Sequence, residues 1–234
     1  MNQELSNLRK QLYVFKSISI ITIIILLALG FYVIREDIQN SKLLVTEGII
    51  IQDTLGNDRI LIGSPLPYSS KRVRADSAKA WETYIAKWPE ERRMQVWDWF
   101  KGYNHTSNGI VILSESGYDR IAIGDPTPDP VIGKRIAPGC GFTLMDDQGY
   151  ERGGMGVMNF DGKYRVTLGL DSDKGSEGIT LMVDDDGFNG LFVPGTEKYI
   201  FLGNTDTSFF ATQPYAKFNG LIIRNKDSIL VDIQ

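Results

Sequence analysis

The acidic segment DSDKGSE, residues 171–177, is the best candidate for an ion site in this sequence. Asp171, Asp173 and Glu177 place oxygen ligands at alternate positions around a glycine, as in the first half of a calcium loop. The acid that closes a complete calcium loop is missing, because Met182 stands at its position. Turn chemistry with ordinary surface charge explains the segment equally simply. Calcium is the one cofactor that the sequence suggests, and both interpretations stay open.

Other chemistry has little support. His105 is the only histidine, and its loop sequence, YNHTSNG, is typical of a solvated side chain. The chain has no CxxC zinc pair and neither of the common glycine-rich nucleotide motifs. Carboxylates are plentiful, so a carboxylate-dependent envelope hydrolase remains as a second alternative, with two acids about 5–9.5 Å apart in one pocket. We expect a protein that is not an enzyme.

All four tryptophans lie in one stretch, residues 71–104. Their spacing predicts a two-helix insertion with an aromatic face on each helix. Aromatic side chains are enriched at protein interfaces, so these faces are the predicted partner-binding surface. Its residues are Trp81, Tyr84, Trp88, Trp97 and Phe100. The alternatives are a lid that packs on the rest of the domain and a contact with the bilayer interface.

A repeated phrase must position these residues. It consists of a glycine, a short apolar run, a polar turn that usually holds Asp and Gly, and a second apolar run. Its copies begin at Gly48, Gly109, Gly141, Gly178 and Gly220. Each copy is typical of a β-hairpin, so residues 47–234 are predicted to form a mainly β domain of stacked hairpins, solenoid-like or prism-like. A small propeller or an irregular barrel is the alternative.

Two further features accompany the repeats. Arg59, Arg120 and Arg152 each stand three residues after a turn glycine, where they form either an anion-binding row or, more economically, pairs with neighbouring turns. Two proline-rich links, SPLPYSSKR after the first hairpin and residues 125–138 after the second, share their proline spacing and a Lys-Arg pair. The repeating unit is therefore longer than the hairpin.

Residues 17–34 contain no charge and would span roughly 27 Å as a helix, close to the hydrocarbon thickness of a bilayer. No small-residue cleavage site follows, so we expect a retained transmembrane anchor in contact with lipid. Residues 1–16 would form a cytoplasmic leader, because basic residues precede the apolar run. Residues 35–46 would form a neck, and the β domain would be periplasmic or extracellular.

The net charge is −4, and the leader holds three basic residues and one acidic residue. The remainder has 22 basic and 28 acidic residues, which argues against nucleic acid as a partner. Cys140 is the only cysteine, so no disulfide can form within the chain. A small buried hydrophobic residue is the expected role for it.

The phrases DxxGxxR and YERGGMG, followed by YRVTLGLD, resemble those of uncharacterised bacterial membrane-anchored repeat proteins, over residues 47–70 and 108–172. The resemblance implies no activity. We therefore expect a non-enzymatic structural or scaffolding subunit of a cell-envelope assembly, present as a homo-oligomer or in a membrane-protein complex. An extracytoplasmic module that binds a glycan or calcium is the alternative.

Overall fold

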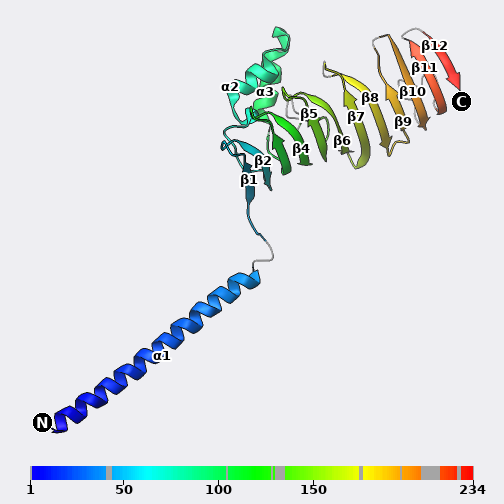
Figure 1. Ribbon diagram of the computed structural model, residues 1–234. Coiled ribbons are helices and arrows are strands. Elements are labelled where there is room, and N and C mark those ends of the chain that lie inside the picture. Colours follow the sequence, from blue (N-terminus) through cyan, green and yellow to red (C-terminus); the bar gives the residue numbers. More distant parts are fainter. Residues whose placement is uncertain are drawn as a thin grey trace. The chain divides into compact units, whose positions relative to one another are not determined.

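The computed structural model describes residues 2–40, 44–103, 105–127, 129, 135–173, 176–195, 197–206, 217–225 and 228–233. The chain divides into two compact units, residues 1–46 and residues 47–234 (Figure 1). The first unit contains a helix, and the second contains a sheet with short helices near its N-terminal end.

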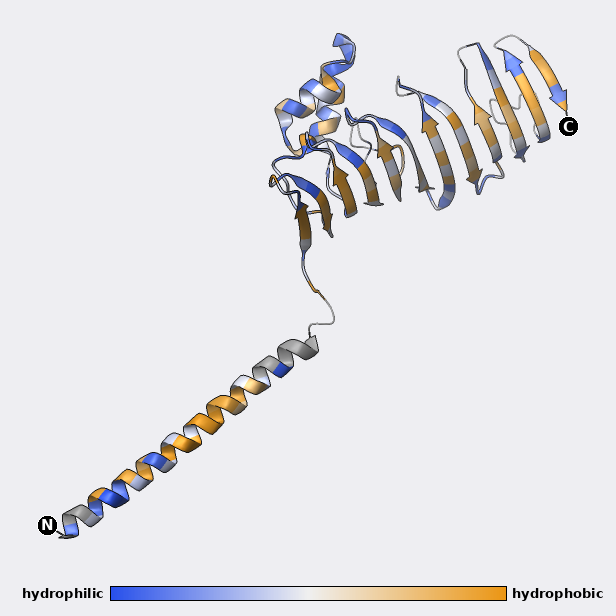
Figure 2. Ribbon diagram, in the orientation of Figure 1, coloured by the Kyte–Doolittle hydropathy of each residue, from blue (hydrophilic) through white to orange (hydrophobic). Residues whose placement is uncertain are grey.

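Helix α1 (Asn2–Asn40) makes up most of the first unit. Its candidate membrane span, Ser6–Tyr32, contains an 18-residue stretch with a mean hydropathy of 2.4, and none of that stretch is buried by the rest of the protein (Figure 2). Twenty-seven residues at about 1.5 Å each exceed the thickness of a hydrocarbon core. One helix is thus long and apolar enough to cross a membrane. Helix α1 extends beyond the predicted membrane segment, residues 17–34, because the charged residues on either side of that segment do not interrupt the helical backbone.

The second unit is mainly β, as predicted. The strands are β1 (Gly48–Gln52), β2 (Asp58–Gly63), β3 (Asn108–Leu113), β4 (Asp119–Asp125), β5 (Gly139–Met145), β6 (Glu151–Phe160), β7 (Lys163–Asp171), β8 (Glu177–Asp184), β9 (Asn189–Val193), β10 (Lys198–Thr205), β11 (Phe218–Asn225) and β12 (Ile229–Ile233). Between β2 and β3 lie the 3-10 turn η1 (Val73–Ala75), helix α2 (Ser77–Ala80), the π-helical turn η2 (Trp81–Ile85) and helix α3 (Glu90–Gly102).

The strands form one 12-stranded sheet in which every strand pairs with its sequence neighbours, in the order β1 to β12. All of these pairings are antiparallel. This confirms the mainly β fold built from hairpins, with one N-terminal apolar helix and short helices in the middle. The hairpins are arranged side by side as a single sheet (Figure 1).

The hairpin turns have the chemistry that the sequence predicts. Gly56, Gly117 and Gly149 have φ values of 77°, 83° and 81°, a region that favours glycine. The Asp53 carboxylate accepts a hydrogen bond of 2.9 Å from the backbone N–H of Leu55. Each of these turns is followed by a shift of register between the two strands, as a bulge would produce. The first three hairpins therefore share one backbone design.

One side of the sheet, which we call the apolar face, carries an unbroken row of apolar residues across all the strands. The register aligns Ile49, Ile62, Ile110, Ile123, Phe142, Met155, Leu168, Leu181, Leu191, Leu202, Leu221 and Ile233. A second row on the same face lies two residues away along each strand and is apolar except for one glycine. It consists of Ile51, Ile60, Ile112, Ile121, Leu144, Gly153, Leu170, Ile179, Val193, Ile200, Ile223 and Val231. Because side chains along a strand alternate between the two faces of the sheet, the residues of both rows point to the same face.

The opposite side, the covered face, carries the buried core. The link after β2 crosses it: Leu66 is buried against Leu61 and Val111, and its N–H donates to the Ser107 carbonyl at 2.8 Å. A Cβ on Gly63 would lie 2.5 Å from the Pro65 carbonyl oxygen, so the link needs this glycine to approach the strand. The link ends at the short helices, which have their own buried cluster.

A second core lies near the C-terminal end of the covered face, around Phe188, Phe201, Phe218 and Ile222. Between the two cores, the row that contains Leu61 and Phe201 is occupied by small residues. These are Thr143, Gly154, Gly169 and Thr180, on β5, β6, β7 and β8. Neither apolar core extends over these small residues, and the candidate site lies there.

Candidate functional site

The site is built on an acid that recurs two residues after the turn glycine, at the start of the second strand of each of the first four hairpins. In the first four hairpins this acid is Asp58, Asp119, Glu151 and Glu177. The first of them is buried and accepts a hydrogen bond of 2.6 Å from the Ser69 hydroxyl, on the link that crosses the covered face. A buried acid of this kind needs such a partner.

Asp119 has the strongest partners. The Arg72 guanidinium donates to its two oxygens at 2.7 and 2.5 Å, and Arg74 lies 3.4 Å away. All three side chains are buried, with at most 8% of any of them exposed. Burial would raise the pKa of Asp119, but the two guanidinium charges outweigh it and hold this pKa below its usual range. The pair fastens the insertion to the sheet.

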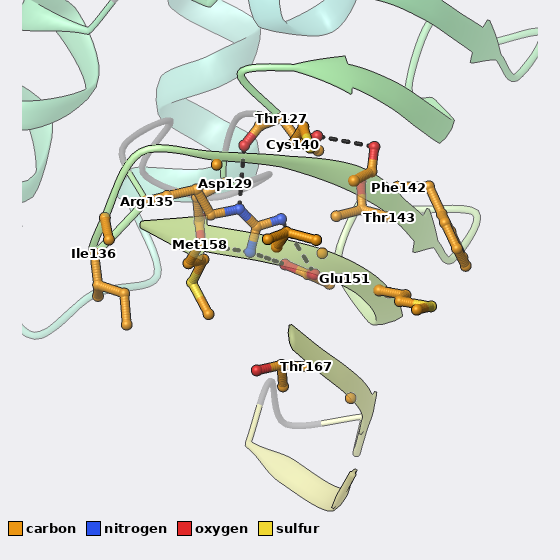
Figure 3. A pocket seen from close by; sticks show the side chains of 18 of the residues that line it. Thr127, Asp129, Arg135, Ile136, Cys140, Phe142, Thr143, Glu151, Met158 and Thr167 are labelled. Atoms are coloured by element: carbon orange, nitrogen blue, oxygen red, sulfur yellow. Dashed lines mark hydrogen bonds and ion pairs between the residues drawn. The ribbon is translucent and has the colours of Figure 1, made fainter. Parts of the chain in front are cut away.

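The second link repeats this arrangement. Arg135, the arginine of its Lys-Arg pair, contacts both carboxylate oxygens of Glu151 at 3.3 Å and donates to the Thr127 carbonyl at 3.3 Å (Figure 3). Arg72 and Arg135 thus pair with the acid of the hairpin that follows their own link. The connection from β6 to β7 is a tight turn at Asp161 and Gly162 and supplies no such arginine to the fourth hairpin.

A cavity of about 350 Å³ opens where this pattern stops. It lies along β5, β6, β7 and the start of β8, next to the second link (Figure 3). Its polar and charged side chains are Thr127, Asp129, Arg135, Thr143, Glu151, Thr167, Asp171 and Glu177. Gly141, Gly154, Gly156 and Gly169 also line it, so part of the cavity wall is bare backbone.

Among the described residues that line this cavity, four carboxylates, of Asp129, Glu151, Asp171 and Glu177, face one cation, Arg135. Burial raises the pKa of Glu151 to about 7; the Arg135 charge opposes this shift, while Asp129 and Asp171 reinforce it. Burial and the Glu177 charge raise the pKa of Asp171 as well. A positively charged ligand would favour the ionised form of both groups.

Two hydroxyls in the cavity lack partners. Thr143 is 2% exposed, and its Oγ1 makes no hydrogen bond within the protein. The Oγ1 of Thr167 is likewise buried without a partner. Both residues line the cavity. Because an unpaired buried hydroxyl is costly, these two atoms mark where polar groups of a ligand would be accommodated.

The predicted ion-binding residues are only partly brought together. Asp171 and Glu177 are directly opposite each other on β7 and β8, and both line the cavity. Asp173 is exposed in the turn between them and does not line it. Within the described ranges, no three His, Cys, Asp or Glu side chains form a group that could hold a metal ion. Calcium binding stays a prediction.

The predicted partner-binding aromatics lie in the insertion. Tyr84 and Phe100 are 2% and 4% exposed and stack with a centroid separation of 6.3 Å, so they belong to its core. The other three, Trp81, Trp88 and Trp97, are half-buried against this core. The insertion packs on the hairpin turns, as a lid would: Lys87 Nζ donates to the Tyr150 hydroxyl at 2.7 Å.

The recurring arginines and Cys140 are the other residues for which the sequence predicts a role. Arg59 lies 3.8 Å from Glu115 of the neighbouring turn, which is the kind of pair expected, and its Nε donates to the Leu113 carbonyl at 3.1 Å. Arg120 Nε donates to the Met145 carbonyl of the next hairpin at 3.1 Å, whereas Arg152 lies 3.8 Å from Asp146 of its own turn. The burial expected for Cys140 is wrong. This residue is exposed, because its side chain lies on the apolar face of β5, which no core covers.

The solvated role expected for His105 is also wrong. Its ring is half-buried against Phe100, with a centroid separation of 4.0 Å, and its Nδ1 lies 3.1 Å from Arg74. Burial, together with the Arg74 charge, lowers the pKa of His105 to about 4. Glu151, Arg135 and Thr143 were missed as site residues. The shared Lys-Arg pairs of the two links were the available signal for the first two.

Comparison of the chain with protein-family models, with curated proteins and with solved structures gives no significant match. Function is therefore argued from the two surfaces described above, the apolar face and the cavity.

Proposed function

We propose that this protein is a membrane-anchored, non-enzymatic scaffold subunit of the cell envelope, which assembles with a second copy of itself through the apolar face. The exposure of that face carries the proposal. Ile123, Leu181 and Leu202 are 47%, 49% and 50% exposed, and they belong to one continuous row. Contiguous apolar surface of this extent is rare on soluble monomers and marks an interaction surface.

The size of the face suits a second copy. Eleven strand spacings of about 4.8 Å give a width of roughly 53 Å, and two rows along the strands add roughly 13 Å. The product is about 700 Å² per copy, close to the roughly 800 Å² that each partner contributes to a stable interface. Sheets also pack well face to face through interdigitated aliphatic side chains.

The character of the face favours self-association over a different partner. The two rows consist almost entirely of Ile, Leu, Val, Met and Phe, which can interdigitate with the same residues related by a two-fold axis. An anchor in the membrane would also concentrate copies in one plane and in one orientation. The basic residues Arg9, Lys10 and Lys16 support a cytoplasmic N-terminus, with the sheet on the other side of the membrane.

The test is the oligomeric state of the full-length chain in mild detergent. Native mass spectrometry should find a dimer or a multiple of it, and the double variant Leu181→Glu/Leu202→Glu should be monomeric with an unchanged β circular-dichroism spectrum. Leu55→Glu is the matched control, because Leu55 is 84% exposed in a hairpin turn away from both rows, and it should remain oligomeric. A monomeric wild type, or an oligomeric double variant, would contradict the proposal.

Cys140 supplies an independent measurement. It is two residues from Phe142 on β5, so its side chain is on the apolar face, and it is exposed. A short bismaleimide should join two copies through this single thiol in native membranes. Absence of the linked dimer at full thiol labelling would place the middle of the face outside the interface.

A further inference from the structure

The cavity on the covered face combines three features that the scaffold role does not use. Its described lining residues carry more carboxylates than cations and two buried hydroxyls without partners, and part of its wall is bare backbone. We infer that it is a binding site for a small organic cation of the amino-sugar class, whose ammonium group lies among Glu151, Asp171 and Glu177 and whose hydroxyls bond to Thr143 and Thr167.

Arg135 is the described cation that lines the cavity. This guanidinium is already occupied by Glu151 and the Thr127 carbonyl, with Asp129 4.0 Å away. No described Lys or Arg forms an ion pair with Asp171 or Glu177. Glu177 accepts a hydrogen bond from the Thr180 hydroxyl at 3.1 Å, which neutralises no charge. An ammonium group here would supply the missing positive charge, and it would lower the raised pKa values of Glu151 and Asp171.

The size and surface of the cavity favour a ring-sized ligand. A volume of about 350 Å³ is within the usual range for small-molecule pockets and far more than one metal ion fills. A Cβ built on Gly169 would have no atom within 4 Å, so the space directly above this strand is open. A pyranose ring can therefore lie close to the backbone of β7, between the acids at one end of the cavity and Thr167.

The unpaired hydroxyls of Thr143 and Thr167 indicate a polar ligand independently of the charges. Only 2% of Thr143 is exposed, so its Oγ1 cannot form a hydrogen bond with bulk water instead. Buried hydroxyls are almost always bonded, and a cavity that contains two unbonded ones is suited to a ligand that donates and accepts hydrogen bonds. A polyol with one ammonium group meets both requirements, whereas a simple diamine meets only the charge requirement.

The test is calorimetric titration of the full-length chain in detergent with glucosamine, glucose, N-acetylglucosamine and putrescine. Glucosamine should bind about tenfold or more tightly than each of the other three, because they lack either the ammonium group or the hydroxyls. Asp171→Asn and Thr143→Val should each weaken glucosamine binding by about tenfold. Asp173→Asn is the matched control, since Asp173 is exposed in the same turn region, and it should bind as wild type does.

Circular dichroism establishes that the variants are folded, and Thr167→Val replaces Thr143→Val if the latter is not. Equal affinity for glucosamine and glucose would overturn the role of charge. Equal affinity for glucosamine and putrescine would overturn the role of the hydroxyls. Calcium binding that both Asp171→Asn and Asp173→Asn abolish would show a metal loop instead. Absence of binding at millimolar glucosamine would reject the site, without bearing on the scaffold proposal.

Discussion

Replacing Asp119 with asparagine should detach the insertion from the sheet. The carboxylate accepts two hydrogen bonds from Arg72, at 2.7 and 2.5 Å, and lies 3.4 Å from Arg74. The amide keeps the size of the side chain but removes its charge. Two guanidinium groups, each at most 8% exposed, would then be buried with no carboxylate between them.

The magnitude follows from this burial. Breaking a buried ion pair by removing one partner costs about 3–5 kcal/mol, because the charge left behind is neither hydrated nor neutralised. Here two like charges remain together, so the upper part of that range applies. By contrast, Asp98 and Lys101 form an ion pair of 3.0 Å with more than half of each side chain exposed. Asp98→Asn should therefore change the free energy of unfolding by less than about 0.5 kcal/mol.

Tryptophan fluorescence is the assay, because all four tryptophans are in the insertion. Urea unfolding of the full-length chain in detergent, followed at the tryptophan emission maximum and by the β circular-dichroism signal, separates the insertion from the sheet. For Asp119→Asn the tryptophan transition should move to much lower urea. If its midpoint matches that of Asp98→Asn, the buried pair does not hold the insertion, and the reasoning is refuted.

The same carboxylate predicts an acid response. Arg72 and Arg74 hold the folded-state pKa of Asp119 below the 3.8 that is usual for a free aspartate. A carboxylate of this kind contributes stability above its unfolded-state pKa, and that stability is lost as the pH falls through the folded-state value. The insertion should thus loosen in wild type only below about pH 3.8. Asp119→Asn should lack this acid step.

Three further predictions concern the sheet. Gly109→Ala should destabilise it by about 2–4 kcal/mol, because the added Cβ would meet the Ile123 carbonyl, whereas Gly169→Ala, with no atom within 4 Å, should be neutral or stabilising in chemical unfolding. Glu151 has a folded pKa of about 7 against 4.5 for the free group, so its contribution to stability is present below about pH 4.5 and lost as the pH rises through 7; Glu151→Gln should flatten that slope in pH-dependent melting. Arg120→Lys should cost less than about 1 kcal/mol in urea titrations, since it loses one partly exposed hydrogen bond of 3.1 Å.

The hairpins and the apolar helix could be predicted because their causes are local. A turn that reads Asp, two residues and Gly specifies its own backbone, and the Asp53 and Gly56 geometry shows this directly. An uncharged run of 18 residues likewise predicts an apolar helix without reference to any other part of the chain. Neither inference requires knowledge of which hairpin lies beside which.

The site depends on contacts between distant residues, and this is why it was only partly predictable. Asp171 and Glu177 were found because they stand six positions apart around one turn. Glu151 and Arg135 come from different elements, and their meeting depends on the path of a proline-rich link across the sheet. The matching Lys-Arg pairs of the two links showed that they are equivalent, but not which acids they reach.

The role of the aromatic residues could not be read from their spacing for a related reason. The spacing of Tyr84 and Phe100 correctly puts each on an apolar helix face. Spacing cannot distinguish a face that packs inward from one that awaits a partner, because both need the same periodicity. Here the helices contact a hairpin turn, as the bond from Lys87 to Tyr150 shows, and Tyr84 and Phe100 are buried within the chain. The half-buried Trp81, Trp88 and Trp97 stay a predicted partner-binding surface.

The two proposed surfaces use opposite sides of the same strands. On β5, the Phe142 side chain belongs to the apolar row and the Thr143 side chain lies on the covered face, although Phe142 also borders the cavity; on β7, Leu168 is in the row and Gly169 lines the cavity. Because alternate residues point to opposite faces, association through the apolar row would leave the cavity open. It would also hold the strands beneath the cavity more rigidly. We therefore expect the double variant Leu181→Glu/Leu202→Glu to lose the oligomer while its affinity for glucosamine falls, at most, by a small factor. A complete loss of both properties in this folded variant would show that the two faces form one functional unit.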